Sequence, residues 1–221
     1  MFTYYKSYGI ISIMAKKKTA EILEKSIVSS GFLNVYACTV KTNEHDTPIT
    51  REVMERGHAV AILVYDPKRD EVLLTNELRI GLLASGEYPY SDALPAGMID
   101  ANETPLMAAI RELKEETGLT LQNPTVIHSG AYASAGGSTE RIALVYGTVD
   151  MTKAGGTHGK AEEGEKIETV IISGQEFIDR AYSGKLKGMS SLTLAFWFAN
   201  QRDKLICNKP APSNEVPKPK K

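Results

Sequence analysis

The chain has 221 residues, of which 42% are hydrophobic, and its formal net charge is −1. This length suits one domain with appendages or one domain with a small second unit, and the near-zero charge excludes a general attraction to nucleic acid or membranes. The two cysteines, Cys38 and Cys207, lie far apart in the sequence, so we expect reduced thiols in a cytoplasmic protein instead of a disulfide framework.

The two ends of the chain lack the pattern of a packed core. Residues 1–19 are predicted to be a disordered or wrongly included extension, and the apolar stretch at 1–14 is too short to cross a bilayer. Residues 208–221 contain four prolines and four lysines, which predicts a disordered tail. Such tails more often solubilise than bind RNA, so we expect neither a membrane nor a nucleic acid as partner.

A small N-terminal β unit is predicted at residues 20–56, with strands at 32–40 and 49–54. The main domain is predicted at 57–207. It opens with an uninterrupted apolar run at 59–65 (AVAILVY), which is typical of a strand buried on both faces. A turn at Asp66 and Pro67 then leads into a hairpin partner at 71–78.

A helix is predicted after Thr104, whose hydroxyl is a suitable cap, because Pro105 fits the first helical turn. Gly118 is placed to end this helix in a left-handed conformation. Its apolar stripe, at spacings of four, three and four, consists of Leu106, Ile110, Leu113 and Thr117.

The remainder of the main domain alternates strands with helices. Strands are predicted at 125–132, 140–149 and 166–172, and a long glycine-rich loop at 151–164. Ser173 with Glu176 is a capping box that begins a helix reaching Tyr182. A last helix at 191–202 is apolar on nearly all sides, so we expect it to be buried. The pattern predicts an α/β fold, a mixed sheet with helices on its faces.

Three glutamates on the helix after Thr104 point to chemistry. Glu112, Glu115 and Glu116 stand at i, i+3 and i+4, so their carboxylates crowd one turn and repel one another. A cation would turn that repulsion into coordination, and an oxygen-only cluster favours Mg²⁺, with Mn²⁺ as the alternative. Divalent ions there would neutralise a diphosphate and favour attack of water on a phosphorus–oxygen bond. Taken alone, the three glutamates also fit a solvated acidic face.

The wider spacing separates these two interpretations. It reads Gly, five residues, Glu, seven residues, Arg-Glu-Leu, one residue, Glu-Glu, one residue, Gly-Leu, and its members are Gly97, Glu103, Arg111, Glu112, Leu113, Glu115, Glu116, Gly118 and Leu119. Average residue usage gives a chance of roughly 10⁻⁷ for such a match in a chain of this length. The pattern resembles the box of the Nudix hydrolases, which cut nucleoside diphosphates linked to a second group. This resemblance implies an α/β/α sandwich preceded by a small N-terminal β unit.

Beyond the box, residues 20 to 205 resemble the ADP-ribose pyrophosphatase branch, which also includes GDP-mannose pyrophosphatases. The motifs that carry this are Arg56-Gly57-His58-Ala59-Val60, Asn76-Glu77-Leu78-Arg79, Leu94-Pro95-Ala96-Gly97-Met98-Ile99, Ser134-Ala135-Gly136 with Glu140-Arg141, and Glu162-Glu163-Gly164-Glu165.

The resemblance implies roles for individual residues. The metal ligands it implies are the carbonyl of Ala96 and the side chains of Glu112, Glu116 and Glu165. The catalytic residues it implies are Glu163 as general base, with Glu115 and Arg111. The substrate contacts it implies are Arg79, Arg51, Gly97, Met98, Ser134 and Glu140.

Some of these roles have alternatives. Glu163 and Glu165 could exchange the roles of base and ligand, or belong to an exposed acidic loop. Arg51 resembles an arginine that relatives lend to the nucleobase pocket of a partner subunit, which implies a swapped homodimer. An ordinary ion-paired strand arginine fits it almost as well.

The substrate implied first is ADP-ribose, cleaved to AMP and ribose 5-phosphate. Two departures weaken that preference. Ala135 replaces the proline of the branch's Ser-Pro-Gly, and the loop at 81–91 offers only Glu87 and tyrosines as specific contacts. GDP-mannose or another ADP-sugar is the nearest alternative. A non-catalytic ADP-ribose sensor and an RNA 5′-end pyrophosphohydrolase are alternatives of other classes.

Overall fold

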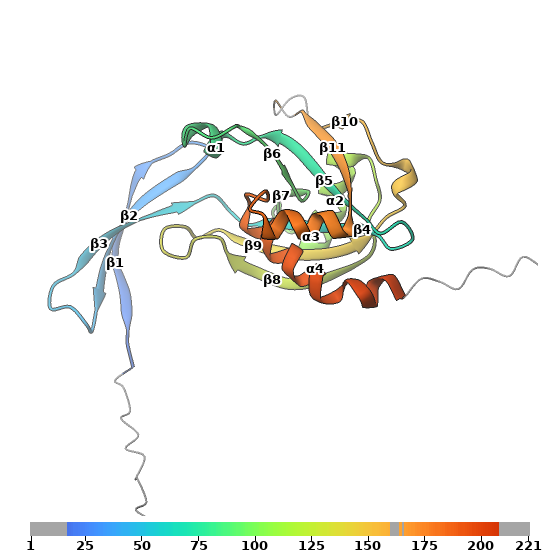
Figure 1. Cartoon of the computed structure of the whole chain (residues 1–221). Helices are drawn as coiled ribbons and strands as arrows, with labels where there is room; N and C mark the ends of the chain where they lie inside the picture. The colour runs from blue at the N-terminus through green and yellow to red at the C-terminus, as the bar shows by residue number, and fades with distance from the viewer. Residues whose placement is uncertain (1–16, 160–163, 165, 208–221) are drawn as a thin grey trace, which may run out of the picture. The chain divides into compact units, whose positions relative to one another are not determined.

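The computed structural model describes residues 17–159, 164 and 166–207 (Figure 1). The chain divides into two compact units between Met54 and Glu55. The first unit is a three-stranded sheet in the order β1-β2-β3, formed by β1 (Ala20–Ser29), β2 (Asn34–Thr42) and β3 (Ile49–Glu55). Strand β1 runs antiparallel to β2, and all ten of its residues are exposed.

The second unit is built on a mixed sheet with the path β10-β11-β5-β4-β9-β8, in which β6 also pairs with β5 and β7 with β4. Its strands are β4 (Ala59–Asp66), β5 (Glu71–Leu78), β6 (Tyr90–Ala93), β7 (Ala96–Met98), β8 (Gln122–Tyr132), β9 (Arg141–Thr148), β10 (Thr157–His158) and β11 (Ile167–Ser173). Strands β4 and β9 are parallel, whereas the other neighbouring strands of this sheet pair antiparallel within the described residues.

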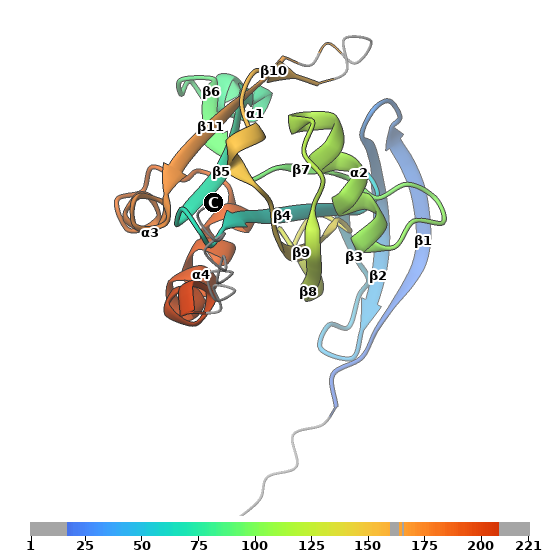
Figure 2. The ribbon, with the colours of Figure 1, turned by 90° about the vertical axis from the view of Figure 1, so that its right-hand side faces the viewer.

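Helices cover both faces of this sheet, as Figure 2 shows for α2 on one side of β4 and for α3 and α4 on the other. They are α1 (Ile80–Ala84), α2 (Pro105–Thr117), the 3-10 turn η1 (Met151–Lys153), α3 (Gly174–Tyr182) and α4 (Met189–Cys207). The expected α/β/α sandwich is therefore confirmed.

Strand β4 supplies the centre of two cores because successive side chains point to opposite faces. Val60, Ile62 and Val64 pack with α2. Ala61, Leu63 and Tyr65 pack with the aromatic rings that α3 and α4 contribute. All six of these β4 side chains have 0% exposure, and each large one contributes about 1.5–3 kcal/mol to stability.

The predicted ends of the helices agree with the structure. Thr104 Oγ1 accepts a hydrogen bond from the Met107 N–H at 3.3 Å, and Gly118 ends α2 with φ of 70°. Ser173 Oγ accepts from the Glu176 N–H at 3.0 Å. The first and last turns of α2 and the start of α3 are thus fixed by local chemistry that the sequence makes visible.

Other sequence expectations need correction. The strand expected at 32–40 begins at Asn34, and β1 was not predicted. The strand expected at 125–132 begins at Gln122, and the loop at 151–164 contains η1 and β10. Helix α4 is longer than expected and buries one face only, through residues such as Leu194 and Phe198, while Phe196 is 40% exposed.

The apolar stripe of α2 is also rotated from the predicted one. Ile110 is 40% exposed, and the residues that face the sheet are Ala108, Ala109, Leu113, Glu116 and Thr117. The two alanines let the helix approach β4 closely, because they place little volume between the two backbones. As a result Glu116 turns inward, not onto the solvated face where the spacing alone had grouped it.

Candidate active site

Strand β7 and helix α2 meet at Gly97. This strand pairs antiparallel with β4, with Gly97 opposite Val60, and the Glu112 side chain lies directly against it. A Cβ added to Gly97 would stand 1.9 Å from the Glu112 carboxyl carbon. The close approach of carboxylate to strand backbone therefore requires glycine at this position.

Arg111 lies at the centre of an acidic cluster formed by Glu103, Glu112, Glu115 and Glu116. Its guanidinium donates to both carboxylate oxygens of Glu103, at 2.9 and 2.7 Å, to Glu112 at 2.8 Å and to Glu115 at 3.2 Å. It also donates to the Met98 carbonyl at 2.8 Å. Because a guanidinium presents a rigid fork of donors, it orients Glu112 and Glu115 and ties α2 to β7.

The charges around Arg111 shift the pKa of Glu103. Hydrogen bonds from Arg111 and from the Asp100 backbone lower the pKa of the Glu103 carboxyl to about 2. Glu103 is therefore ionised throughout the neutral range and serves as a fixed negative partner for Arg111.

Glu116 is the buried member of the cluster, with 5% exposure. Burial, followed by the nearby charges of Glu77 and Glu112, raises its pKa well above the usual value, and a backbone hydrogen bond from Ala96 opposes that shift. Within the described residues, its Oε2 atom has no hydrogen-bond partner. A buried carboxylate oxygen without a partner costs free energy, and a hard cation is a group that would satisfy it.

Glu77 is a site residue to which the sequence assigned no role. It lies on β5, near enough to raise the pKa of Glu116, and Arg79 Nη2 is 2.7 Å from Glu77 Oε1. The motif that contains both residues was visible in the sequence. Their approach to α2, which begins only at Pro105, depends on the pairing of β5 within the sheet.

The remaining predicted substrate contacts are less tightly grouped. Glu140 Oε1 lies 3.5 Å from Arg56 Nε, and Arg56 Nη2 lies 3.8 Å from Met98 Sδ, which links Glu140 to β7. Ser134 is exposed in the turn between β8 and β9, where its carbonyl accepts from the N–H groups of residues 137 and 138. Arg51 belongs to the first unit and donates to the carbonyl of Thr50 at 2.9 Å.

Glu163 and Glu165 lie outside the described residues. In the part of the chain that the structure does describe, no three acidic, histidine or cysteine side chains converge closely enough to share an ion.

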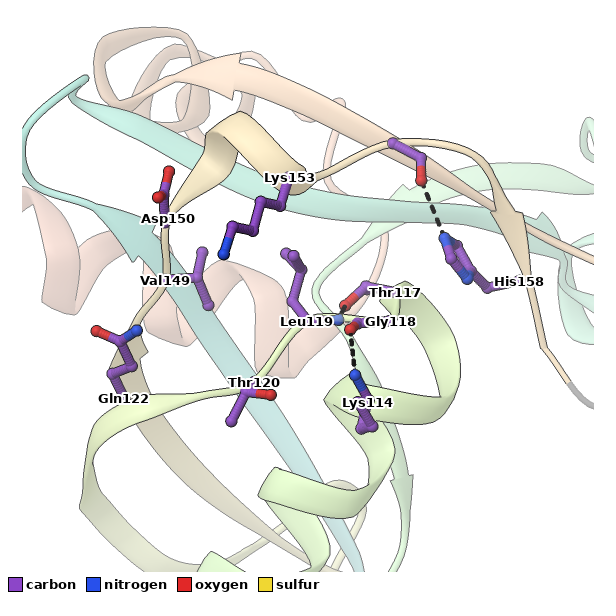
Figure 3. A pocket seen from close by; sticks show the side chains of 11 residues that line it. Lys114, Thr117, Gly118, Leu119, Thr120, Gln122, Val149, Asp150, Lys153 and His158 are labelled. Atoms are coloured by element: carbon purple, nitrogen blue, oxygen red, sulfur yellow. Dashed lines mark hydrogen bonds between the residues drawn. The ribbon is translucent and has the colours of Figure 1, made fainter.

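Two hollows adjoin this region in different ways. One, of about 630 Å³, is lined by Asn76, Glu77, Leu78, Tyr88, Tyr90, Gly164, Lys166 and Glu168. It includes Glu77, whose charge acts on Glu116, but none of the glutamates of α2. Another, of about 370 Å³, lies at the C-terminal end of α2 (Figure 3).

The hollow in Figure 3 lies beside the C-terminal end of α2, and its polar side chains bond to nearby backbone. Lys114 Nζ donates to the Gly118 carbonyl at 2.7 Å, and His158 Nε2 lies 3.0 Å from the Gly155 carbonyl. None of the glutamates of the α2 cluster lines it. A lysine at the last turn complements the helix dipole, so these side chains have a structural explanation.

Taken together, the inward-facing Glu116, three glutamates held by one arginine, and the glycine against Glu112 define an oxygen-donor site on an α/β/α sandwich. Comparison with known proteins gives the family: the model described as "NUDIX domain" matches residues 55–173. The chain belongs to this family of hydrolases.

The relatives agree with that assignment. The chain is 32% identical to the ADP-ribose pyrophosphatase of Escherichia coli (strain K12), over 82% of this chain and 88% of the relative. It is 25% identical to the GDP-mannose pyrophosphatase of Cronobacter sakazakii, with 79% and 92% covered. A solved "ADP compounds hydrolase" superposes with a TM-score of 0.67 at 20% identity, covering 85% of this chain and 98% of that one.

Proposed function

We propose that this protein hydrolyses the diphosphate bond of nucleoside diphosphate sugars, with ADP-ribose preferred and AMP and ribose 5-phosphate as products. The observation that carries the proposal is the Glu112–Glu116 pair of α2, packed against β7 and bounded by Arg111. The ADP-ribose pyrophosphatase relative, which covers most of the chain, supports the choice of substrate.

The donor set fits a divalent cation. The Ala96 carbonyl, Glu112 and Glu116 would hold it from β7 and α2, and Glu165 would complete the set. All of these donors are oxygens, and the orphaned Glu116 Oε2 is a buried site for positive charge. We infer Mg²⁺ as the ion, with Mn²⁺ as the alternative, and its chemistry would be to neutralise the phosphoryl oxygens and acidify water.

Protein groups have distinct tasks in this proposal. Arg111 orients Glu112 and Glu115 through hydrogen bonds to both carboxylates, and its own pKa is raised by its hydrogen bonds to Glu103 and Glu112. Arg79 binds a phosphate once it exchanges Glu77 for substrate oxygens, because a guanidinium matches phosphate geometry. Glu163 accepts the proton of the attacking water, with Glu165 as the alternative base.

Gly97 and Met98 would form the floor of the site through their backbone. Ser134 and Glu140 would contact the sugar, and the Arg56 ion pair would hold Glu140 in place. Ala135, in the same turn as Ser134, gives no rigid wall of the kind that proline provides. For that reason GDP-mannose, the substrate in a relative's name, is the second candidate.

A homodimer is proposed from the first unit. Strand β1 exposes apolar side chains on both faces, with Ile22 at 58%, Leu23 at 52%, Ile27 at 59% and Val28 at 55%. A three-stranded sheet that exposes so much apolar surface needs a cover, and a second copy of the chain would supply it. In such a dimer Arg51 would reach the nucleobase of the partner's substrate. Among residues 17–159, 164 and 166–207, the helices include none that could cross a membrane. A cytoplasmic location is proposed separately, from the two widely spaced cysteines, which are expected to be reduced.

The test is a substrate panel. Full-length protein with Mg²⁺ is incubated with ADP-ribose, GDP-mannose and other nucleotide sugars, and the released phosphomonoesters are measured through a coupled phosphatase. ADP-ribose should give the highest kcat/KM. A higher kcat/KM with GDP-mannose would make GDP-mannose the preferred substrate. If no nucleotide sugar is hydrolysed, the proposed function is refuted.

Light scattering tests the dimer separately. The full chain of 24.1 kDa should have twice that mass in solution. Replacing Leu23 and Ile27 by lysine should lower the mass in solution to that of one chain. A dimer that persists in this variant would show that the interface lies elsewhere.

A further inference from the structure

We propose that His158 is a positioning residue, which sets the distance between helix α2 and the hairpin formed by β10 and β11. The inference rests on the proposed function and deepens it. Helix α2 carries the proposed metal ligands Glu112 and Glu116. The two strands of the hairpin are joined by residues 159–166, which include the proposed base Glu163. His158 would act on the reaction through this distance, without touching the substrate.

Strand β10 has little support from the sheet. It contains two residues, pairs with β11 and stands at one end of the strand path. His158 is its last residue and pairs with Ile167, which is 1% exposed. Strand β11 then pairs with β5 from Glu168 to Ser173. The β11 side of the hairpin is therefore fixed by the sheet, whereas the β10 side depends on other contacts.

The imidazole of His158 supplies such contacts to two glycines. Its Cε1 atom lies 3.3 Å, and its Nδ1 atom 3.8 Å, from the place that a Cβ on Gly118 would take. Gly118 ends α2 with φ of 70°, so the ring packs against the backbone of the helix terminus. On the other edge of the ring, Nε2 lies 3.0 Å from the Gly155 carbonyl (Figure 3). One ring therefore joins the end of α2, the turn before β10 and the hairpin.

The hydrogen bond between His158 and Gly155 has a defined direction. A carbonyl oxygen can only accept, so Nε2 must carry a hydrogen. The neutral ring with its proton on Nε2 meets this condition, and so does the imidazolium ion. The contact is therefore kept whether or not the ring is charged, and its role is to hold backbone in place.

Helix α2 is held at two places by these contacts. Arg111, within the helix, donates to the carbonyl of Met98 on β7 at 2.8 Å. At the C-terminal end, Gly118 lies against His158. The first contact sets the position of α2 relative to β7, and the second sets it relative to the hairpin. An attacking water and a general base react only within a narrow range of distances, so a displacement of about 1 Å can slow the step about 100-fold.

His158 stands apart from the acidic cluster itself. Among the described residues, those that line the hollow of about 370 Å³ beside His158 include none of the cluster's glutamates. Lys114 in the same hollow donates to the Gly118 carbonyl at 2.7 Å. Lys114 belongs to α2, whereas His158 reaches the helix terminus from another element. Removal of the imidazole should therefore loosen the hairpin from α2 and leave the helix terminus formed.

The kinetic test uses the full-length protein with ADP-ribose and Mg²⁺. His158→Ala should lower kcat about tenfold and leave KM within about twofold, because the base is displaced and the substrate contacts are not. His158→Gln should restore kcat to within about threefold of the wild type, since its amide can donate to the same carbonyl. Its pH profile should keep the wild-type shape. Loss of one limb of the profile in His158→Gln would make His158 an acid or base and overturn the positioning role.

His128→Ala is the matched control. The ring of His128 also bonds to the backbone of a nearby glycine, since its Nδ1 accepts from the Gly130 N–H at 3.1 Å. It is exposed on β8. Loss of this ring should leave kcat and KM within about twofold of the wild type. An equal fall of kcat in the two alanine variants would contradict the proposal.

A double-mutant cycle identifies the group through which His158 acts. In a Glu163→Gln background, His158→Ala should lower kcat by less than about twofold, because the group that it positions is already absent. The same cycle with Glu165→Gln covers the alternative in which the two glutamates exchange roles. A further loss of about tenfold in both backgrounds would show independent effects and overturn the proposal.

Hydrogen exchange separates this proposal from the proposed function, because it needs no turnover. In the metal-free protein, the amides of β10 and of its partner residues in β11 should exchange about tenfold faster in His158→Ala, and those of β4 should not change. This difference in a protein that hydrolyses no nucleotide sugar would refute the function and support the role of His158. Hydrolysis with kcat and exchange insensitive to His158→Ala would do the reverse. Because His158 lies at the sheet edge, the variant should keep its Tm within about 3 °C of the wild type.

Discussion

The carboxylate of Glu112 lies in the space that a side chain at residue 97 would fill. Its oxygens stand 2.1 and 2.3 Å from the position of a Cβ on Gly97. Because the clash is with the end of a flexible side chain and not with backbone, the fold can accept a methyl group there, but only by moving the carboxylate that the site needs.

Gly97→Ala should therefore separate activity from stability. We expect kcat/KM to fall by about 100-fold or more as Glu112 is displaced from Arg111 and from the metal position, while Tm falls by only a few degrees, about 2–4 °C. Steady-state kinetics and thermal melting measure the two effects. Gly188→Ala is the control, since the nearest atom to its added Cβ is 3.8 Å away; equal losses of activity in both variants would contradict the role of Gly97.

Acid stability should depend on Glu103. Its pKa in the folded protein is about 2, against a usual value of 4.5. The stabilisation from Arg111 is therefore complete above about pH 4.5 and is lost as the pH falls through the folded pKa. Urea midpoints of wild type and Glu103→Gln should differ most above pH 5 and converge as the pH approaches 2. A difference that is constant from pH 7 to pH 3 would show that this ion pair does not set the folded pKa.

Much of the box could be predicted from the sequence, because its residues lie close together along the chain. Glu112 and Glu116 share a helix whose cap, Thr104, and terminus, Gly118, are local signals. The inward turn of Glu116 could not be predicted, since it depends on Ala109 facing β4 where Ile110 had been expected. The apolar pattern gives more weight to isoleucine than to alanine, whereas close packing of helix on sheet favours the smaller side chain.

Glu77 shows a second limit of the same kind. No spacing connects it to the box, and only the pairing of β5 in the sheet brings it near Glu116. The N-terminal β1 was missed for another reason: its exposed residues mix charged and apolar side chains in AEILEKSIVS, so the strand lacks the strict alternation that burial of one face imposes.

Glu116→Gln should abolish activity and stabilise the metal-free protein. The variant removes a proposed ligand, so kcat should fall by several orders of magnitude. It also removes a buried ionisable group whose pKa is raised. In the wild type without metal, the free energy of unfolding should decline as the pH rises above about 4.5, the pKa of Glu116 in the unfolded chain. That decline should be absent in the variant.

Thermal melting with and without Mg²⁺ tests both parts. The ion should raise the Tm of the wild type and have little effect on Glu116→Gln, because ligand binding to the folded state adds stability in proportion to its affinity. Glu44→Gln, at a residue exposed in the first unit, is the control and should behave as the wild type. An equal Mg²⁺ response in wild type and Glu116→Gln would place the ion away from α2.

Loss of Glu163 should slow the chemical step without weakening metal binding. If Glu163 is the general base, Glu163→Gln lowers kcat by about 10²–10⁴, and the rate should rise again at higher pH as hydroxide replaces the missing base. The Tm shift caused by Mg²⁺ should remain, since this glutamate is not expected to be a ligand. Glu165→Gln is the matched comparison two residues away: as a proposed ligand, it should reduce the Mg²⁺ shift together with kcat. The opposite result would exchange the two roles. In that case kcat would fall by less than threefold in Glu163→Gln. In Glu165→Gln it would fall by more than 100-fold while the Tm shift caused by Mg²⁺ stayed intact.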